Sequence, residues 1–196
     1  MAGLPHFKNS AVGRNLFEPL YLNQFTVIIT PPASINNTAI NTLLVEHVKK
    51  ISGLPEQAGT GGTVEQAYRF SKRYFAGAKP KETGAKIKID FEVNLNNANE
   101  MYVYNLFRAW ANLVYDPLTG RQGLKKDYAP NGAGVYVGVH NRAGDVYREF
   151  NFSPVFVYGD TNLVEEMKLD YTSDTIYSAT FSFIADSYTE VRNGQF

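Results

Sequence analysis

The sequence predicts a single α+β domain, residues 1–196, that is mainly β with one flanking amphipathic helix. Several stretches alternate apolar and polar residues, as half-buried strands do, and only one stretch carries a clear helical stripe. Aromatic residues make up 14% of the chain, with 13 Phe and 13 Tyr, which favours pleated surfaces. Hydrophobic residues at 44% and charged residues at 19% are typical of a globular domain with a core.

The amino-terminal part is predicted to be an arm followed by two strands. Residues 1–24 form the arm, and residues 23–30 alternate as a strand that ends at Pro31. Residues 42–51 fit either a short helix or a strand, and their β-branched content favours the strand.

The segment from about 56 to 84 is predicted to be a projecting hairpin or loop, because glycines flank an extended middle part. The next segment, 86–95, is the clearest strand, with an apolar residue at every odd position and a polar one at every even position. One face of this strand must be buried, and the other meets water or a polar partner.

The helix is predicted over about 97–115. Asn97 and Glu100 have the spacing of a capping box, and Asp116-Pro117 ends the helix. A long loop over about 116–133, of a length typical of partner contacts, follows. The apolar stripe of the helix consists of Val103, Leu106, Phe107, Trp110 and Val114.

The remainder is predicted to be β. Strands 134–140 and 146–152 flank a hairpin connection, and 154–158 is expected to extend the second of them. Residues 163–171 and 176–184 are expected to form another pair.

Composition argues against several kinds of function. The chain has no cysteine, and its three histidines lie far apart, outside metal-binding spacings, so we expect no metal or other cofactor. No nucleophile elbow or phosphate loop is present, so we expect no enzyme. No apolar run approaches the length of a membrane span, and the first residues lack the apolar region of a signal peptide.

Charge is balanced overall but uneven along the chain, since 19 basic residues match 19 acidic ones. Residues 69–88 hold seven basic residues and one acid, whereas residues 160–190 hold seven acids and one basic residue. These segments are either two solvated surfaces of chance composition or complementary surfaces between copies of the chain. The residues predicted to act in self-assembly are Arg69, Lys72, Arg73, Lys79, Lys81, Asp160, Glu165, Glu166, Asp170 and Asp174.

Antiparallel sheets leave unpaired edges, and copies that pair edge to edge in a ring would close a barrel. The polar face of the strands would then line a channel. By alternation, the residues predicted to face this lumen are Lys88, Asp90, Glu92, Ser178, Thr180 and Ser182.

Several short motifs follow one another in a distinctive order. The most specific is the run 160–171, with Thr161-Asn162 before two glutamates and Leu169-Asp170 before an aromatic residue. Upstream of it lie Asn15-Leu16-Phe17, Gly53-Leu54-Pro55 and the charged strand before a Trp-bearing helix. The order of these motifs resembles that of tube proteins of contractile phage tails, a group similar to the inner-tube proteins of type VI secretion. Two connections, 31–41 and 116–133, are longer than in compact members.

The resemblance implies a sandwich or barrel-like subunit that forms hexameric rings, stacked into a hollow tube through which DNA is ejected. Its implied partners are copies of itself, a sheath, baseplate components and a tape-measure protein. The implied location is the virion tail, assembled in the host cytoplasm. A tube initiator of the baseplate and the inner tube of a bacterial injection system are alternatives of the same class. A monomeric ligand-binding β domain, with Trp110 as a stacking platform, is the alternative from a different class.

Overall fold

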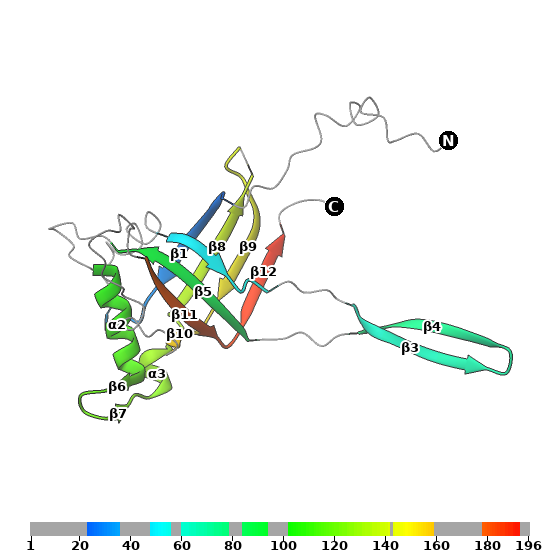
Figure 1. Ribbon diagram of the computed structural model, residues 1–196, viewed down its shortest axis with the longest axis horizontal. Coiled ribbons are helices and arrows are strands. Elements are labelled where there is room, and N and C mark those ends of the chain that lie inside the picture. Colours follow the sequence, from blue (N-terminus) through cyan, green and yellow to red (C-terminus); the bar gives the residue numbers. More distant parts are fainter. Residues whose placement is uncertain are drawn as a thin grey trace, which may run out of the picture.

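Two antiparallel four-stranded sheets face each other across one hydrophobic core, with a helix at one side (Figure 1). This computed structural model describes residues 23–35, 48–55, 60–78, 84–93, 102–141, 143–158 and 178–192. The predicted class, α+β and mainly β with antiparallel strands, is confirmed. No helix in the described ranges is long and apolar enough to span a membrane.

The first sheet has the order β1-β8-β9-β12. Its buried apolar side chains point toward the second sheet, as Val27 and Ile29 do in β1. The last strand of this sheet is not among those predicted from the sequence. Its strands are β1 (Phe25–Thr30), β8 (Gly134–His140), β9 (Val146–Phe152) and β12 (Tyr188–Arg192).

The second sheet has the order β10-β11-β5-β2. In β5 the inward side chains Ile87, Ile89 and Phe91 are at most 1% exposed, whereas their polar neighbours face outward. The predicted partner of β11, residues 163–171, lies outside the described residues, as does 42–47 before β2. The strands are β10 (Val155–Tyr158), β11 (Ser178–Ala185), β5 (Ala85–Glu92) and β2 (Val48–Ser52).

One strand prediction is wrong: residues 154–158 do not extend β9. Strand β9 ends at Phe152 in the first sheet, and β10 pairs with β11 in the second. Pro154 has no backbone N–H to continue the β9 ladder, so the chain changes sheets there. The chain also passes from the second sheet to the first between β11 and β12, at the same corner. There Ser153 N donates to Ser187 O (3.1 Å) and Asp186 N donates to Pro154 O (3.1 Å).

Helix α2 (Tyr102–Val114) packs its predicted stripe against the inward face of the second sheet. The ring of Phe107 lies 4.8 Å from that of Phe181 and 5.2 Å from that of Phe91. Trp110 is fully buried, and its Nε1–H donates to Tyr128 O at 2.7 Å. The predicted capping residues Asn97 and Glu100 lie outside the described residues.

The segment 116–133 contains regular structure. Strands β6 (Tyr115–Asp116) and β7 (Arg121–Gln122) pair, and the short helix α3 (Lys125–Tyr128) follows. Lys125 Nζ lies 2.5 Å from Asp186 Oδ2, which joins α3 to the corner between β11 and β12. The hydrogen bond that the Lys125 ammonium donates to Asp186 raises the pKa of Lys125.

Strands β9 and β12 of the first sheet carry a cluster of three charged side chains, Arg148, Glu190 and Arg192. Arg148 of β9 and Arg192 of β12 each donate from Nε to Glu190 Oε1, at 2.5 and 2.7 Å. Burial of Glu190 by itself raises its pKa, but the hydrogen bonds from Arg192 and Arg148 outweigh burial, so the pKa lies below its ordinary value.

Truncation of Phe107 tests the role of the helix in the core. Phe107→Ala is expected to lower the free energy of unfolding by about 3–5 kcal/mol, because it leaves a cavity among four aromatic rings. Urea unfolding followed by Trp110 fluorescence measures this. Asn112→Ala on the exposed side of α2 is the control and should change stability by less than about 0.5 kcal/mol; equal effects would contradict the packing described.

Glu190→Gln tests the charged cluster and its pH dependence. The pKa of Glu190 is lower in the folded chain than in the unfolded chain, so its charged carboxylate stabilises the fold at every pH above the unfolded-state pKa. This stabilisation is lost as the pH falls through the folded-state pKa of Glu190. The variant should be less stable than the original by about 1–3 kcal/mol at pH 7. In urea titrations the difference should shrink below about pH 4. Glu65→Gln, in an exposed pair, is the control, and a difference independent of pH would contradict the assignment.

Candidate functional site

The six residues predicted to face a lumen lie together on the outward face of the second sheet. They form three pairs in register between β5 and β11. Thr180 Oγ1 donates to Asp90 Oδ1 at 2.8 Å. The pairs are Lys88 with Ser182, Asp90 with Thr180, and Glu92 with Ser178.

Strand β2 adds basic residues to this face. Lys50 lies opposite Asp90, and Lys49 Nζ lies 3.5 Å from Glu92 Oε1. The carboxylates at this end of the face are therefore accompanied by ammonium groups. A surface ion pair of this exposure contributes little to stability, about 0–1 kcal/mol.

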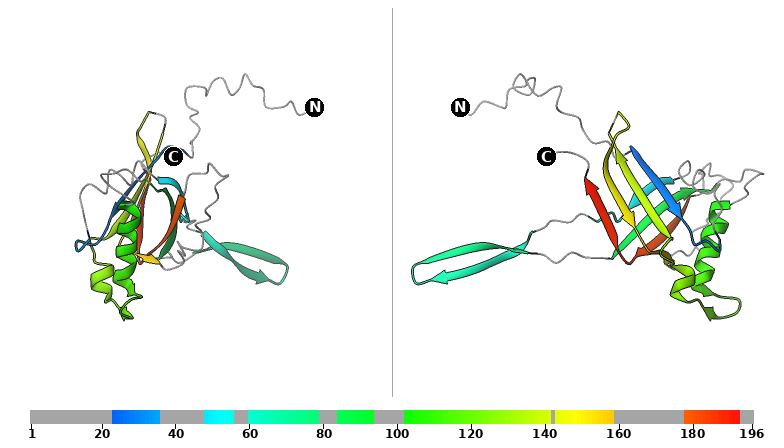
Figure 2. Two further views of the ribbon diagram at one scale, coloured as in Figure 1. Left: turned by 60° about the vertical axis from the view of Figure 1, so that its left-hand side comes forward. Right: turned by 180° about the vertical axis from the view of Figure 1, so that it is seen from behind.

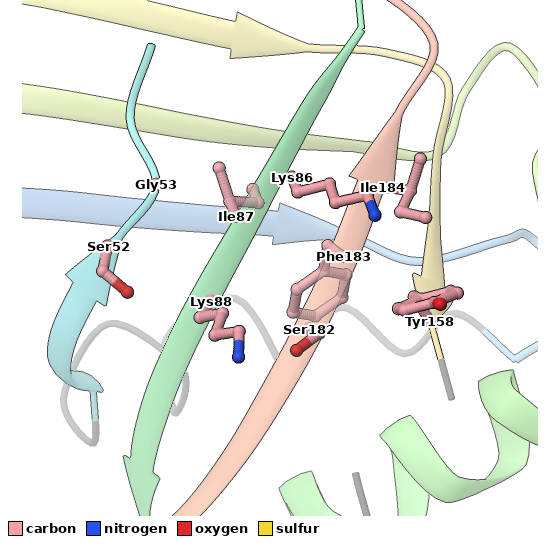
Figure 3. A pocket seen from close by; sticks show the side chains of 9 residues that line it. All are labelled: Ser52, Gly53, Lys86, Ile87, Lys88, Tyr158, Ser182, Phe183 and Ile184. Atoms are coloured by element: carbon pink, nitrogen blue, oxygen red, sulfur yellow. The ribbon is translucent and has the colours of Figure 1, made fainter. Parts of the chain in front are cut away.

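The other end of the face is hollowed into a depression of about 300 Å³ (Figure 3). Lys86 and Lys88 extend over it from β5, with Ser182 beside them on β11 and Tyr158 on β10. Gly53 bounds it after β2, where a Cβ would lie 2.3 Å from Lys86 O, so a side chain at this position would collide with β5. The remaining lining residues are Ser52, Ile87, Phe183 and Ile184.

Strands β3 (Thr60–Tyr68) and β4 (Ser71–Ala78) form a hairpin that projects from the sandwich, on the side away from α2 (Figures 1 and 2). Every side chain from 63 to 76 is exposed. Val64 is 60% exposed and lies opposite Phe75, and Phe70 at the turn is 91% exposed. The hairpin therefore presents large apolar side chains to its surroundings instead of to its own core.

Three of the predicted self-assembly residues lie on this hairpin. Lys72 Nζ is 2.6 Å from Glu65 Oε1, and the guanidinium of Arg73 lies 5.5 Å from the centre of the Tyr68 ring. Arg69 lies in the two-residue turn, next to Phe70. The other predicted residues lie outside the described residues: Lys79, Lys81, Asp160, Glu165, Glu166, Asp170 and Asp174.

Sequence reasoning missed two features of these surfaces. The exposure of the hairpin aromatics was not predicted, although the glycines that separate 63–76 from the neighbouring strands are the signal for it. The position of Tyr158 opposite Ser182 is the second, because the sequence predicts that 154–158 extends strand 146–152, whereas β10 pairs with β11. Among the described residues no group of three side chains is arranged to hold a metal ion.

No protein-family model matches the sequence, and no curated protein matches it either. The fold is similar to that of the tube-terminating cap of the anti-feeding prophage, with a TM-score of 0.51 and 17% identity over 90% of this chain and 93% of that one. The tube–sheath complex of the PVC extracellular contractile injection system also matches, with a TM-score of 0.49 and 17% identity over 96% and 99% of the two chains. At this identity the first comparison establishes the fold, which is the one that the resemblance to contractile-tail tube proteins implies.

The hairpin is expected to be the least stable part of the described structure. A two-stranded hairpin without a packed face is marginal in water, so its amides should exchange with solvent far faster than those of β5 and β11. Hydrogen exchange of the dilute, unassembled chain measures this. Exchange in β3 and β4 as slow as in the sandwich would show that the hairpin is stable by itself.

Proposed function

We propose that the chain is a structural component of a contractile tail, where it assembles with copies of itself as stacked hexameric rings into the inner tube. The β3–β4 hairpin carries the proposal, because its exposed apolar side chains need a partner surface that the described part of the chain does not supply. The similarity in fold to a tube-terminating cap supports this class of protein.

A neighbouring copy is the partner that suits the hairpin. Contact with it would remove water from Val64, Phe70 and Phe75, at roughly 25 cal/mol for each Å² of apolar surface buried. The basic residues of the hairpin and the acidic segment 160–190 then steer copies together and fix their register. In this arrangement Lys79 and Lys81 contribute to the same basic surface as Arg69, Lys72 and Arg73.

The sheets themselves support ring formation. Among the described strands, β1 and β12 are the edges of one sheet, and β10 and β2 are the edges of the other. Exposed edges favour pairing with another chain, and a closed ring removes them. The outward face of the second sheet then lines the lumen, with Asp90 and Thr180 at its surface.

The chain works in this role without catalysis or a cofactor. Its partners are further copies, a sheath, a baseplate and a tape-measure protein, and its place is the tail of a virion assembled in the host cytoplasm. DNA leaves the particle through the lumen of the tube.

The fold comparison also favours a second candidate of the same class, a cap that ends a tube instead of extending it. A tube protein forms assemblies of many rings, whereas a cap forms one ring. The ligand-platform alternative loses its main residue, since Trp110 is fully buried in the core.

Charge reversal on the hairpin tests the proposal. Arg69→Glu with Arg73→Glu should raise the protein concentration needed for assembly by at least about tenfold, because the hairpin would then repel the acidic segment. Negative-stain electron microscopy of the concentrated chain is expected to show stacked rings, and light scattering gives the concentration dependence.

The control variant reverses Arg121 and Lys126, which are exposed and remote from the hairpin in sequence, and so changes the net charge equally. Its assembly should resemble that of the original chain. A concentrated original chain that stays monomeric, without rings, would refute the proposal. Rings that never stack would favour the cap.

A further inference from the structure

We propose that the depression on the outward face of the second sheet is a binding site for phosphate groups. The site is formed within one subunit and goes beyond the proposed function, which assigns this face to a lumen without giving it a ligand. Only its position inside a tube rests on that function.

Strand register places four polar side chains in one row across the whole sheet. Ser52 of β2 lies opposite Lys88 of β5, Lys88 lies opposite Ser182 of β11, and Ser182 lies opposite Tyr158 of β10. Because directly opposed residues share a face, three hydroxyl groups and one ammonium group converge on the same depression (Figure 3).

A second ammonium group is held at the same place. Lys86 lies two residues before Lys88 and so shares its face, and its Nζ is 5.3 Å from the centre of the Tyr158 ring. The cation–π contact directs this side chain across the sheet toward β10. Ser182 is only 8% exposed, so its hydroxyl lies at the bottom of the site.

The depression carries positive charge that the described residues do not neutralise. The acidic residues of this face, Asp90 and Glu92, lie toward its other end, opposite Thr180 and Ser178. In the described ranges no carboxylate lies within ion-pair distance of Lys86 or Lys88, and none lines the depression. An anionic ligand supplies the missing charge.

The donor set suits phosphate. A lysine ammonium is a compact charge that binds phosphate oxygens, and hydroxyl groups donate to the oxygens that remain. Donors from four strands surround the site, as a tetrahedral group with several oxygens requires. The ring of Tyr158, 38% exposed, offers a surface on which a base of a single-stranded nucleic acid can stack.

The test uses the full chain at a concentration at which it is unassembled. Fluorescence anisotropy of a labelled 12-nucleotide oligothymidylate measures binding at low and physiological salt, with pyrophosphate and polyglutamate as competitors. Lys86→Gln with Lys88→Gln should weaken binding by about tenfold or more. The matched control, Lys49→Gln with Lys50→Gln, removes the same charge from the other end of the face and should stay within about twofold.

Pyrophosphate should compete, and polyglutamate should compete much less. Isothermal titration calorimetry measures pyrophosphate binding directly. Pyrophosphate binding without oligonucleotide binding would assign the site to free phosphate, and binding of both would assign it to phosphodiesters as well. Equal losses in the two double variants, equal competition by polyglutamate, or no binding of either phosphate probe would overturn the proposal.

Assembly separates this proposal from the proposed function. The Lys86 and Lys88 double variant should still form rings, because both lysines lie on β5 and neither belongs to the β3–β4 hairpin. Rings without phosphate binding would refute the site alone, and phosphate binding without rings would refute the tube alone.

Discussion

The in-register pairing of β5 with β11 is the constraint on which the rest of the structure depends. It sets Ile89 opposite Phe181 on the core side and Asp90 opposite Thr180 on the outward side. A slip of one residue would exchange the two faces of β5, burying lysines and exposing isoleucines. The same pairing therefore holds the core together and builds the polar face with its depression.

Helix α2 packs against the core side of the paired strands β5 and β11. Phe107 touches rings from both β5 and β11, so the two strands share one aromatic cluster. By contrast, the β3–β4 hairpin is held by its own ladder and by exposed contacts such as Lys72 with Glu65. The molecule thus combines a sandwich with a packed core and a two-stranded ribbon whose large apolar side chains are exposed.

Elements with strong local patterns were predictable from the sequence. The alternation of β5 and the stripe of α2 identify their buried residues, because one period repeats over enough residues to be distinctive. The break between β9 and β10 was not predictable, since both strands alternate and only Ser153 and Pro154 separate them. The depression could not be predicted either, because it depends on which strands become neighbours, and this is decided by the core of the whole sandwich.

A phosphate site in a conduit is consistent with transport if binding is weak. Two exposed lysines in water are screened over about 8 Å at physiological salt, so their attraction is local. A dissociation constant of about 1 mM corresponds to −4.1 kcal/mol, and with association at about 10⁶ M⁻¹ s⁻¹ each contact lasts about a millisecond or less. If the chain assembles into rings as proposed, copies of Lys86 and Lys88 around a ring would meet a passing nucleic acid in many short contacts.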